Sequence, residues 1–391
     1  MRSAADEGKG IDARPRAGRA AASLLVYAGL CLGLGVAPSA LTQTRPREAA
    51  PAVTIEADAP PPQKLSGADH RAAGRAGNRD AQTVDDDEVV RVETSEVLLP
   101  VTVRDASGRL VSDLTREDFR VYEDGREQPL SGLALRQVPV DVALLVDSSS
   151  SVAANFEDFR RAADEFAGRI APEDRFSLVK FDDRVELLLD WTQSRLQLRR
   201  ALRRLSTGVF TRFNDALLLS AREHFRREPR RRALVVLSDG IDSGRGAATL
   251  EAALRALLEA QVSVYVISNT EMERARKQAE LDNLLAGTDS SVRFNELRIG
   301  DLREGLRVLD ASQRNLEQLA RATGGRSYRP ASFAGLDRVY TEIAEELRRQ
   351  YAIYYTPTNP ARDGRFRRVR VETPGRPFQL NTRVGYFAPR S

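Results

Sequence analysis

The sequence predicts an α/β fold with a doubly wound, mainly parallel sheet, one antiparallel edge strand, and a small all-β unit formed by segments before and after it. Short apolar runs alternate with segments of helical periodicity from about residue 138 to residue 350. Residues 90–137 and 351–391 instead have the two-residue periodicity of half-buried strands. Alternating strands and helices are typical of a parallel sheet that helices cover on both faces.

The α/β part begins with residues 140–146 (VDVALLV), a mostly apolar run that suits a central strand. The next helix, over residues 156–170, places five apolar side chains on one face: Phe156, Phe159, Ala163, Phe166 and Ile170. Asp182 and Asp183 are interpreted as a hairpin turn and not as an acid pair, and Trp191 as a packing residue. Further strands are predicted at 176–181, 185–189, 233–237, 262–267 and near 326–328, and further helices at 196–205, 214–225, 250–258, 316–322 and 336–349.

The β unit has strand patterns on both sides of the α/β part. They lie at 96–103, 119–122 and 132–136 before it, and at 351–355, 366–372 and 379–387 after it. Asp124-Gly125 is a good hairpin signal. Because a domain inserted into another has both of its ends close together, we expect the two groups of strands to pair in one sandwich. Residues 268–315 are charged and interrupt the alternation, so they are interpreted as an insertion on a loop or an exposed helix without an assigned function.

The N-terminal segment has the pattern of an export signal. Arg14, Arg16 and Arg19 precede an uncharged stretch over residues 20–37, and small residues follow it. Residues 1–40 are therefore predicted to be a cleaved signal peptide or, alternatively, an uncleaved membrane anchor through residues 20–37. Residues 41–89 have the composition of a disordered linker. The expected location is the periplasm, the cell envelope or the medium.

Composition excludes several classes of protein. The 391 residues carry a net charge of only +4, which gives no electrostatic case for nucleic acid binding. Cys31 is the only cysteine, so no intrachain disulfide is possible. The two histidines, His70 and His224, nearly exclude a zinc site with several histidine or cysteine ligands. A Ser-His-Asp triad would have to depend on His224.

Acidic and hydroxyl side chains follow two of the predicted central strands. Asp147 directly follows residues 140–146 and is followed by a run of serines. In the same way, Ser238-Asp239-Gly240 follows residues 233–237. If these parallel strands are neighbours, the two carboxylates approach each other at the carboxyl edge of the sheet, where ligands of such folds bind. Two nearby carboxylates favour a cation or a shared proton, and hydroxyls with one or two carboxylates suit magnesium.

These residues resemble the metal-ion-dependent adhesion site (MIDAS) of von Willebrand factor type A and integrin I domains. Asp147-x-Ser149-x-Ser151 is similar to the DxSxS signature, Thr211 stands in a loop similar to the T-x-x-x-D-A-L form, and Ser238-Asp239-Gly240 is similar to the aspartate motif. The resemblance implies that Ser149, Ser151 and Thr211 bind Mg²⁺, or alternatively Mn²⁺ or Ca²⁺, directly or through water. Asp147 and Asp239 would bind mostly through water.

The same resemblance implies an open coordination position for an acidic residue of a partner protein, and a last helix, here residues 336–349, that can shift on binding. In the competing interpretation, Asp147 and the serines only cap the helix at residue 156. Asp242 and Ser243 are interpreted as turn or cap residues and not as residues that support the metal ligands. Segments such as Val101-Thr102-Val103-Arg104-Asp105 and Arg383-Val384-Gly385-Tyr386 resemble the VWFA-related proteins frequent in Acidobacteria.

Three functions compete at this point. The first is an exported adhesion-type module that binds a carboxylate of a protein partner through the metal. The second is a scaffold or assembly factor of an envelope complex, with a structural metal. The third, a metal-assisted hydrolase, is the weakest, because no suitably placed general base, phosphate-binding loop or second metal cluster is visible in the sequence. No catalytic residue is assigned.

Overall fold

A computed structural model describes residues 96–135, 138–149, 155–225 and 230–390, which all fall within one compact unit of the chain. Ser151, the predicted signal or anchor at 1–40 and the predicted linker at 41–89 lie outside the described residues. In the described part of the chain, no helix is both long and apolar enough to cross a membrane.

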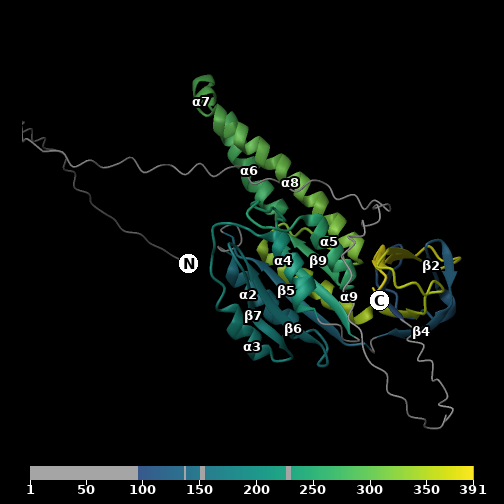
Figure 1. Ribbon diagram of the computed structural model, residues 1–391. Coiled ribbons are helices and arrows are strands. Elements are labelled where there is room, and N and C mark those ends of the chain that lie inside the picture. The colour runs from purple at the N-terminus through teal and green to yellow at the C-terminus, as the bar shows by residue number, and fades with distance from the viewer. Residues whose placement is uncertain (1–95, 136–137, 150–154, 226–229, 391) are drawn as a thin grey trace, which may run out of the picture. The chain divides into compact units, whose positions relative to one another are not determined.

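The centre of the structure is a six-stranded sheet in the order β10-β9-β8-β5-β6-β7 (Figure 1). All neighbouring strands are parallel except β6 and β7, which pair antiparallel at one edge. The doubly wound fold and its antiparallel edge strand are therefore confirmed. The strands are β5 (Val140–Asp147), β6 (Arg175–Phe181), β7 (Val185–Thr192), β8 (Arg231–Ser238), β9 (Ser263–Ser268) and β10 (Ser327–Tyr328).

Helices cover both faces of this sheet. Strands β5 and β9 are therefore buried at every residue. One apolar core lies between the sheet and the helices α2 (Phe156–Ala167), α3 (Arg195–Leu202) and α9 (Leu336–Arg349). The core on the opposite face is closed by α4 (Phe213–Leu219), α5 (Leu250–Glu259) and the end of α8 (Glu296–Thr323). A short 3-10 turn over Phe333–Gly335 leads into α9.

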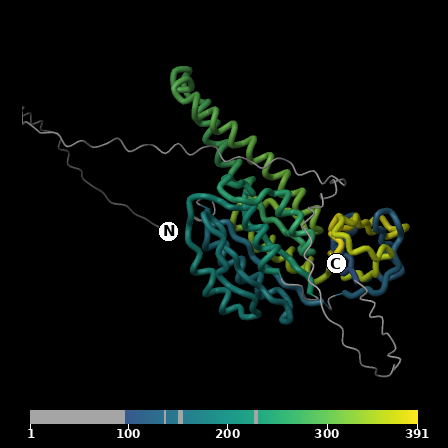
Figure 2. The backbone as a smooth tube through the Cα atoms, viewed as in Figure 1, coloured from purple at the N-terminus to yellow at the C-terminus, as the bar shows by residue number. Residues whose placement is uncertain are grey.

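Two four-stranded antiparallel sheets form the β unit, in the orders β13-β1-β11-β4 and β14-β12-β2-β3. Strands from before and after the α/β part pair directly, as in Val97 opposite Tyr355, so the predicted contribution of both segments is confirmed (Figure 2). The strands are β1 (Val97–Arg104), β2 (Arg120–Glu123), β3 (Arg126–Gln128), β4 (Leu130–Leu135), β11 (Tyr351–Tyr355), β12 (Phe366–Glu372), β13 (Gln379–Asn381) and β14 (Gly385–Phe387). A 3-10 turn at Arg116–Asp118 precedes β2.

Several elements differ from the sequence prediction. Residues 379–387 form two strands in different sheets, because Thr382 and Arg383 donate to the carbonyls of Pro100 and Leu98 where the chain crosses over. The predicted helix 214–225 is an α-helix only as far as Leu219, where α4 ends, and it continues as a π-helical turn over Ser220–His224. The short strand β3 was not predicted, because its Arg-Glu-Gln sequence lacks an apolar alternation.

The charged segment 268–315 is helical. It contains α6 (Thr270–Leu285), α7 (Asp289–Phe294) and most of α8, which begins twenty residues before the predicted helix at 316. A small cluster of buried Leu281, Ile299 and Leu302 packs α6 against α8, and both helices extend away from the sheet (Figure 1). Spaced apolar residues on two facing helices therefore bury enough surface to order a segment that is charged elsewhere.

The last helix is tied to the β unit by a buried carboxylate. Glu346 of α9 is fully buried, and its Oε2 lies 2.6 Å from Nη2 of Arg104 on β1. The hydroxyl groups of Thr102 and Tyr265 donate to its other oxygen at 3.1 and 3.3 Å. Because only Gln350 separates α9 from β11, the end of this helix is joined to both the central sheet and the β unit.

We expect the Phe166→Ala variant to lower the free energy of unfolding by about 3–5 kcal/mol, because it leaves a cavity in a core that cannot collapse. Phe166 of α2 is completely buried, and its ring centre lies 5.3 Å from that of Tyr340 on α9. Urea unfolding followed by circular dichroism measures the change. Phe294→Ala is the matched control, since Phe294 is 89% exposed, and it should change the value by at most about 0.5 kcal/mol. Equal losses in the two variants would contradict the core assignment.

Candidate metal centre

Asp147 lies at the carboxyl edge of the sheet because β5 and β8 are direct neighbours, with Val146 opposite Leu237. Its carboxylate is held on both sides: Oδ2 accepts a hydrogen bond from Ser238 Oγ at 2.9 Å, and Oδ1 accepts one from the backbone N–H of Ser149, also at 2.9 Å. Asp147, Ser149 and Ser238 have no exposed surface. The two predicted motifs therefore meet at one point, and the contact is made by side chains 91 residues apart.

Asp239 follows β8 and is 3% exposed, and its Oδ1 accepts a hydrogen bond from the N–H of Ile241 at 3.0 Å. The turn requires glycine at position 240, where φ is +70° and a Cβ atom would lie 2.7 Å from the side chain of Leu316. The hydroxyl of Ser312, on α8, donates to the carbonyl of Asp239. Helix α8 thus packs against the turn at Asp239 and Gly240.

Thr211 lies on the loop before α4 and is completely buried. Ser243, which follows Asp239 in the chain, hydrogen-bonds to the backbone of Thr211. The N–H of Thr211 donates to Ser243 Oγ at 3.1 Å, while the N–H and hydroxyl of Ser243 donate to the Thr211 carbonyl at 2.9 and 2.8 Å. Asp242 accepts from the N–H groups of Asn214 and Gly244. Asp242 and Ser243 make the hydrogen bonds of turn and cap residues, and they also connect two loops of the candidate site.

The β6–β7 turn holds the same loop from its other side. The Asp182 N–H donates to the carbonyl of Arg184, which confirms the hairpin turn. The Asp182 carbonyl accepts from the N–H of Arg212 at 3.1 Å, and Asp183 accepts from that of Phe210 at 2.8 Å. Sequence reasoning missed this second role, because no local pattern connects a hairpin turn with a loop some 27 residues later.

Lys180 stabilises this arrangement from inside the protein. It is 4% exposed, its Nζ lies 2.9 Å from Asp182 Oδ2, and it donates to the hydroxyl of Ser206 at 3.0 Å. Buried charges persist where they are paired and hydrogen-bonded. The ion pair between Lys180 and Asp182 therefore gives the Thr211 loop a rigid support.

The donor set at this edge fits a hard divalent cation. Among the described residues, Asp147 and Ser149 follow β5 and Asp239 follows the neighbouring strand β8 at the same edge of the sheet. Thr211 lies on a loop that is hydrogen-bonded to Ser243, four residues after Asp239. Oxygen donors of this kind suit Mg²⁺, Mn²⁺ and Ca²⁺. No group of three or more His, Cys, Asp or Glu side chains with metal-binding geometry occurs in the described ranges. A cation here would therefore depend on hydroxyl oxygens as well as on the two carboxylates.

Two other predicted features lie away from this edge. Trp191 stacks on His224 with ring centres 4.4 Å apart, so its interpretation as a packing residue is confirmed. Nε2 of His224 lies 2.6 Å from the hydroxyl of Ser177, near the opposite end of β6 from Phe181. His224 is therefore far along the strand from the candidate metal ligands.

Comparison with known families identifies the α/β part. Residues 141–304 match the family model of the von Willebrand factor type A domain, and the doubly wound, mainly parallel sheet is consistent with that match. The chain contains a von Willebrand factor type A (VWA) domain, as its motifs predicted. No curated protein matches the chain.

Several solved structures are similar to this chain at low sequence identity. Proximal thread matrix protein 1 from the mussel byssus is 16% identical, with 57% of this chain and 50% of that chain covered and a TM-score of 0.38. A structure of the same protein with a zinc-occupied MIDAS motif is 17% identical, with 57% and 49% covered and a TM-score of 0.38. The von Willebrand factor domain of the type V pili tip protein Mfa5 from Porphyromonas gingivalis is 13% identical, with 54% and 95% covered and a TM-score of 0.37. The chain spans about half the length of the first of these proteins.

We expect Ser243→Ala to weaken binding of Mn²⁺ or Mg²⁺ by about tenfold to a hundredfold, because residues that orient metal ligands typically contribute that much. The variant removes the hydroxyl that contacts both the N–H and the carbonyl of Thr211. Isothermal titration calorimetry measures the affinity, and the circular dichroism spectrum checks the fold. Ser332→Ala, at an exposed position, is the control and should bind as the unaltered protein does. Unchanged affinity in Ser243→Ala would show that this residue does not position Thr211 for the metal.

Proposed function

We propose that this protein is an exported, metal-dependent protein-binding module of the adhesion type. Its divalent cation, Mg²⁺ or alternatively Mn²⁺ or Ca²⁺, is held by Asp147, Ser149, Ser151, Thr211 and Asp239, and it coordinates an acidic group of a partner protein. The observation that carries the proposal is the buried, hydrogen-bonded oxygen donor set at the carboxyl edge of a VWA sheet. Ligand sites of open α/β sheets lie at this edge.

The protein's own groups prepare the site for binding. Ser238 and the N–H of Ser149 fix the orientation of the Asp147 carboxylate, and Ser243 and Asp183 fix the loop of Thr211. When bound, the cation supplies a Lewis acid position for a ligand carboxylate. Because the two carboxylates would bind mostly through water, the protein groups that touch the cation directly would be neutral hydroxyls, and the cation would stay electrophilic. A negatively charged group of a partner would therefore complete its shell favourably.

The proposal assigns binding and not catalysis to this edge. A hydrolase would need a general base near the metal. In the described ranges, the one histidine, His224, contacts Ser177 and Trp191 near the other end of the sheet. The carboxylates of Asp182 and Asp183 are engaged with Lys180 and with backbone N–H groups. These engagements favour a support role over proton transfer.

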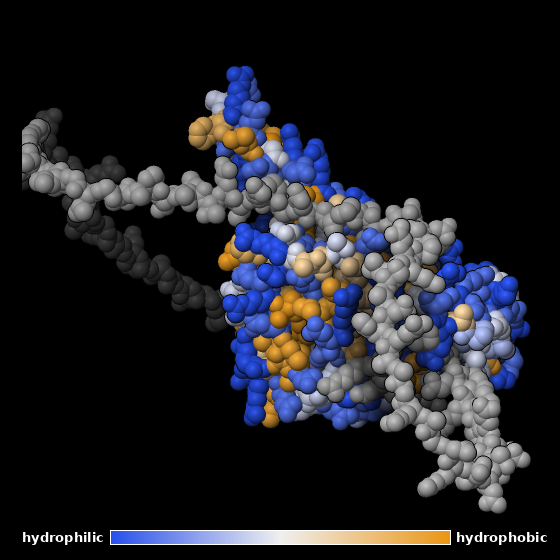
Figure 3. Space-filling model, in the orientation of Figure 1, coloured by the Kyte–Doolittle hydropathy of each residue, from blue (hydrophilic) through white to orange (hydrophobic). Residues whose placement is uncertain are grey.

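A second candidate, a scaffold or assembly factor with a structural metal, is favoured by one observation. Phe294 and Leu297, where α7 meets α8, are 89% and 87% exposed, and apolar side chains gather at this end of the helices (Figure 3). Contiguous exposed apolar patches often mark contact surfaces, and these two side chains would belong to such a patch. A scaffold that binds through these helices would not need the metal.

The export proposal rests on the sequence of the first forty residues, which lie outside the described part. Their basic, apolar and small-residue regions are those of a secretory signal. In the alternative, residues 20–37 remain as a membrane tether. Either arrangement would place the VWA domain outside the cytoplasm, where partners of an adhesion-type module are found.

We expect the unaltered protein to retain partners from envelope extract in the presence of Mg²⁺ and to lose them with chelator, because the cation carries the contact. Asp147→Ala should lose the same partners with Mg²⁺ present, while Asp301→Ala, at an exposed aspartate of α8, should keep them. Pull-down followed by mass spectrometry gives the partner sets, and thermal unfolding shows whether each variant is folded. A partner set that depends neither on metal nor on Asp147 would favour the scaffold.

Phosphatase and protease assays provide a separate test of the assignment as a binding protein. We expect no turnover of generic phosphoester or peptide substrates with Mg²⁺, Mn²⁺ or chelator, since His224 and the acids of the β6–β7 turn are engaged elsewhere. Turnover that chelator abolishes and that Asp147→Ala lacks would contradict the proposal in favour of a metal-assisted hydrolase.

A further inference from the structure

A cavity of about 920 Å³ lies at the amino ends of the parallel strands, where the VWA domain meets the β unit. Arg231 and Arg232, at the start of β8, line it, whereas the candidate metal ligand Asp239 follows the end of the same strand. The cavity is thus separate from the metal site. Its size falls within the range of small-molecule sites, roughly 300–1,000 Å³.

Arginine dominates the lining. Seven arginines and two glutamates line the cavity, and one of the arginines, Arg230, pairs with Asp141 outside the lining, so its walls still carry a surplus of positive charge. Both glutamates are already engaged: Glu259 pairs with Arg255 at 3.0 Å, and Glu96 accepts a hydrogen bond from Ser131 at 2.6 Å. A concentrated surplus of one sign in a concave site raises the local concentration of ligands of the opposite sign.

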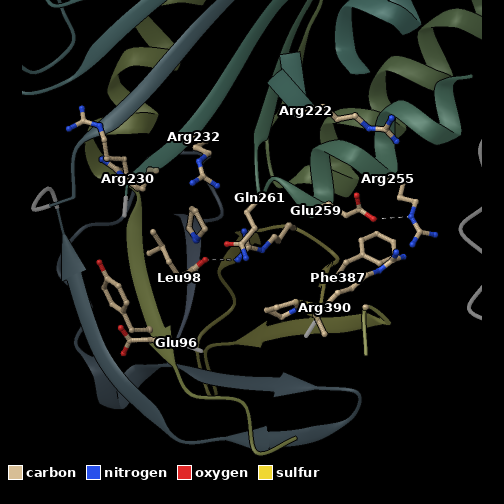
Figure 4. Close-up of a pocket in the computed structure, with 17 residues that line it drawn as sticks. Glu96, Leu98, Arg222, Arg230, Arg232, Arg255, Glu259, Gln261, Phe387 and Arg390 are labelled. Carbon is tan, nitrogen blue, oxygen red and sulfur yellow. Dashed lines mark hydrogen bonds and ion pairs between the residues drawn. The ribbon is translucent and has the colours of Figure 1, made fainter. Parts of the chain in front are cut away.

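The cations come from both parts of the protein and converge on the cavity. Arg222 and Arg255 extend from the helical side, and Arg390 and Phe387 extend from the β unit (Figure 4). The guanidinium carbon of Arg255 lies 4.5 Å from the ring centre of Phe387, which fixes one side of this junction. Within the described residues, the side chains of Arg222 and Arg390 have no ion-pair or hydrogen-bond partner, and both are exposed.

Arg383 provides a second, independent indication of an anion. It lines the cavity, it is only 4% exposed, and one of its nitrogens donates to the carbonyl of Leu98. Its Nε has no hydrogen-bond partner, and no carboxylate of the described residues pairs with it. Burial, with a smaller contribution from nearby Arg232, lowers the pKa of Arg383 to about 10. A buried guanidinium without a counter-ion is costly, so an anion in the cavity would stabilise the folded protein.

We propose that this cavity binds a compact small molecule with several phosphoryl groups, which Arg222, Arg255, Arg383 and Arg390 contact from both sides of the junction. A phosphoryl group carries about two negative charges and three acceptor oxygens, whereas a carboxylate carries one charge. Several such groups in a small volume neutralise a cluster of arginines more completely than the same number of carboxylates. The planar guanidinium matches the geometry of phosphate oxygens.

Sodium tripolyphosphate is the probe for this site. Isothermal titration calorimetry on the full chain, with chelator present to keep divalent cations away from the metal site, should give saturable binding with one site per chain. Thermal unfolding should shift to higher temperature as the probe concentration rises, because the ligand binds only the folded protein. Sodium sulfate at the same ionic strength should produce neither effect. Absence of saturable binding would overturn the proposal.

Variants locate the binding. Arg222→Gln and Arg390→Gln remove exposed side chains and should each weaken tripolyphosphate binding by about tenfold or more, since each loses charge-assisted hydrogen bonds. Arg383→Met should weaken it further. If that variant does not fold, the two exposed variants decide the question. Arg303→Gln, at an exposed position on α8, should bind as the unaltered protein does. Equal losses in Arg303→Gln, or unchanged binding in both exposed cavity variants, would overturn the assignment.

A tetra-aspartate peptide distinguishes phosphoryl groups from carboxylates. We expect it to bind the unaltered protein at least tenfold more weakly than tripolyphosphate does, because its charges are spread over a longer chain. Equal or tighter binding of the peptide would overturn the phosphoryl assignment and indicate an acidic peptide as the ligand.

Discussion

The parallel pairing of β5 with β8 is the constraint on which the candidate metal centre depends. It places Asp147 beside Ser238 and lets the hydroxyl of one strand hold the carboxylate of the other at 2.9 Å. A shift of the register by one residue would move Asp147 to the other face of the sheet and separate it from Ser238. The apolar residues buried on both faces of these strands prevent such a shift, so the packing of the core also determines the geometry of the polar edge.

The loops at this edge are positioned by one another more than by their own sequences. Thr211 is held by Ser243 from one direction and by the β6–β7 turn from the other. Two glycines make the close approach possible: a Cβ at position 208 would lie 2.4 Å from Asp182, and one at position 240 would meet Leu316. The loops of the candidate site are therefore held by the protein's own contacts, and this order would reduce the conformational entropy lost on binding a ligand.

The β unit contributes to the VWA domain through a few buried polar contacts. Glu346 connects α9 with Arg104 and Thr102 of β1, and Arg231 donates to the carbonyl of Leu347 near the end of the same helix. Because α9 continues into β11 with one intervening residue, neither part can move independently of this helix. The arginine-lined cavity lies at the same junction, so a ligand there would act on the contact between the two parts and not on the metal edge.

The sequence by itself determined the α/β class, the edge hairpin, most strands and the residues that end β5 and β8, because these follow from local periodicity and from motifs within a few residues. It also predicted that strands from both ends form the β unit. Tertiary structure decided the rest. Three features depend on contacts between distant residues. Residues 379–387 divide between two sheets, the charged segment folds into helices α6 to α8, and Asp183 supports the loop of Thr211. The arginine cavity was equally invisible, since only three of its arginines, at 230–232, are adjacent in the sequence and the other four come from distant positions that meet only when the two parts fold together.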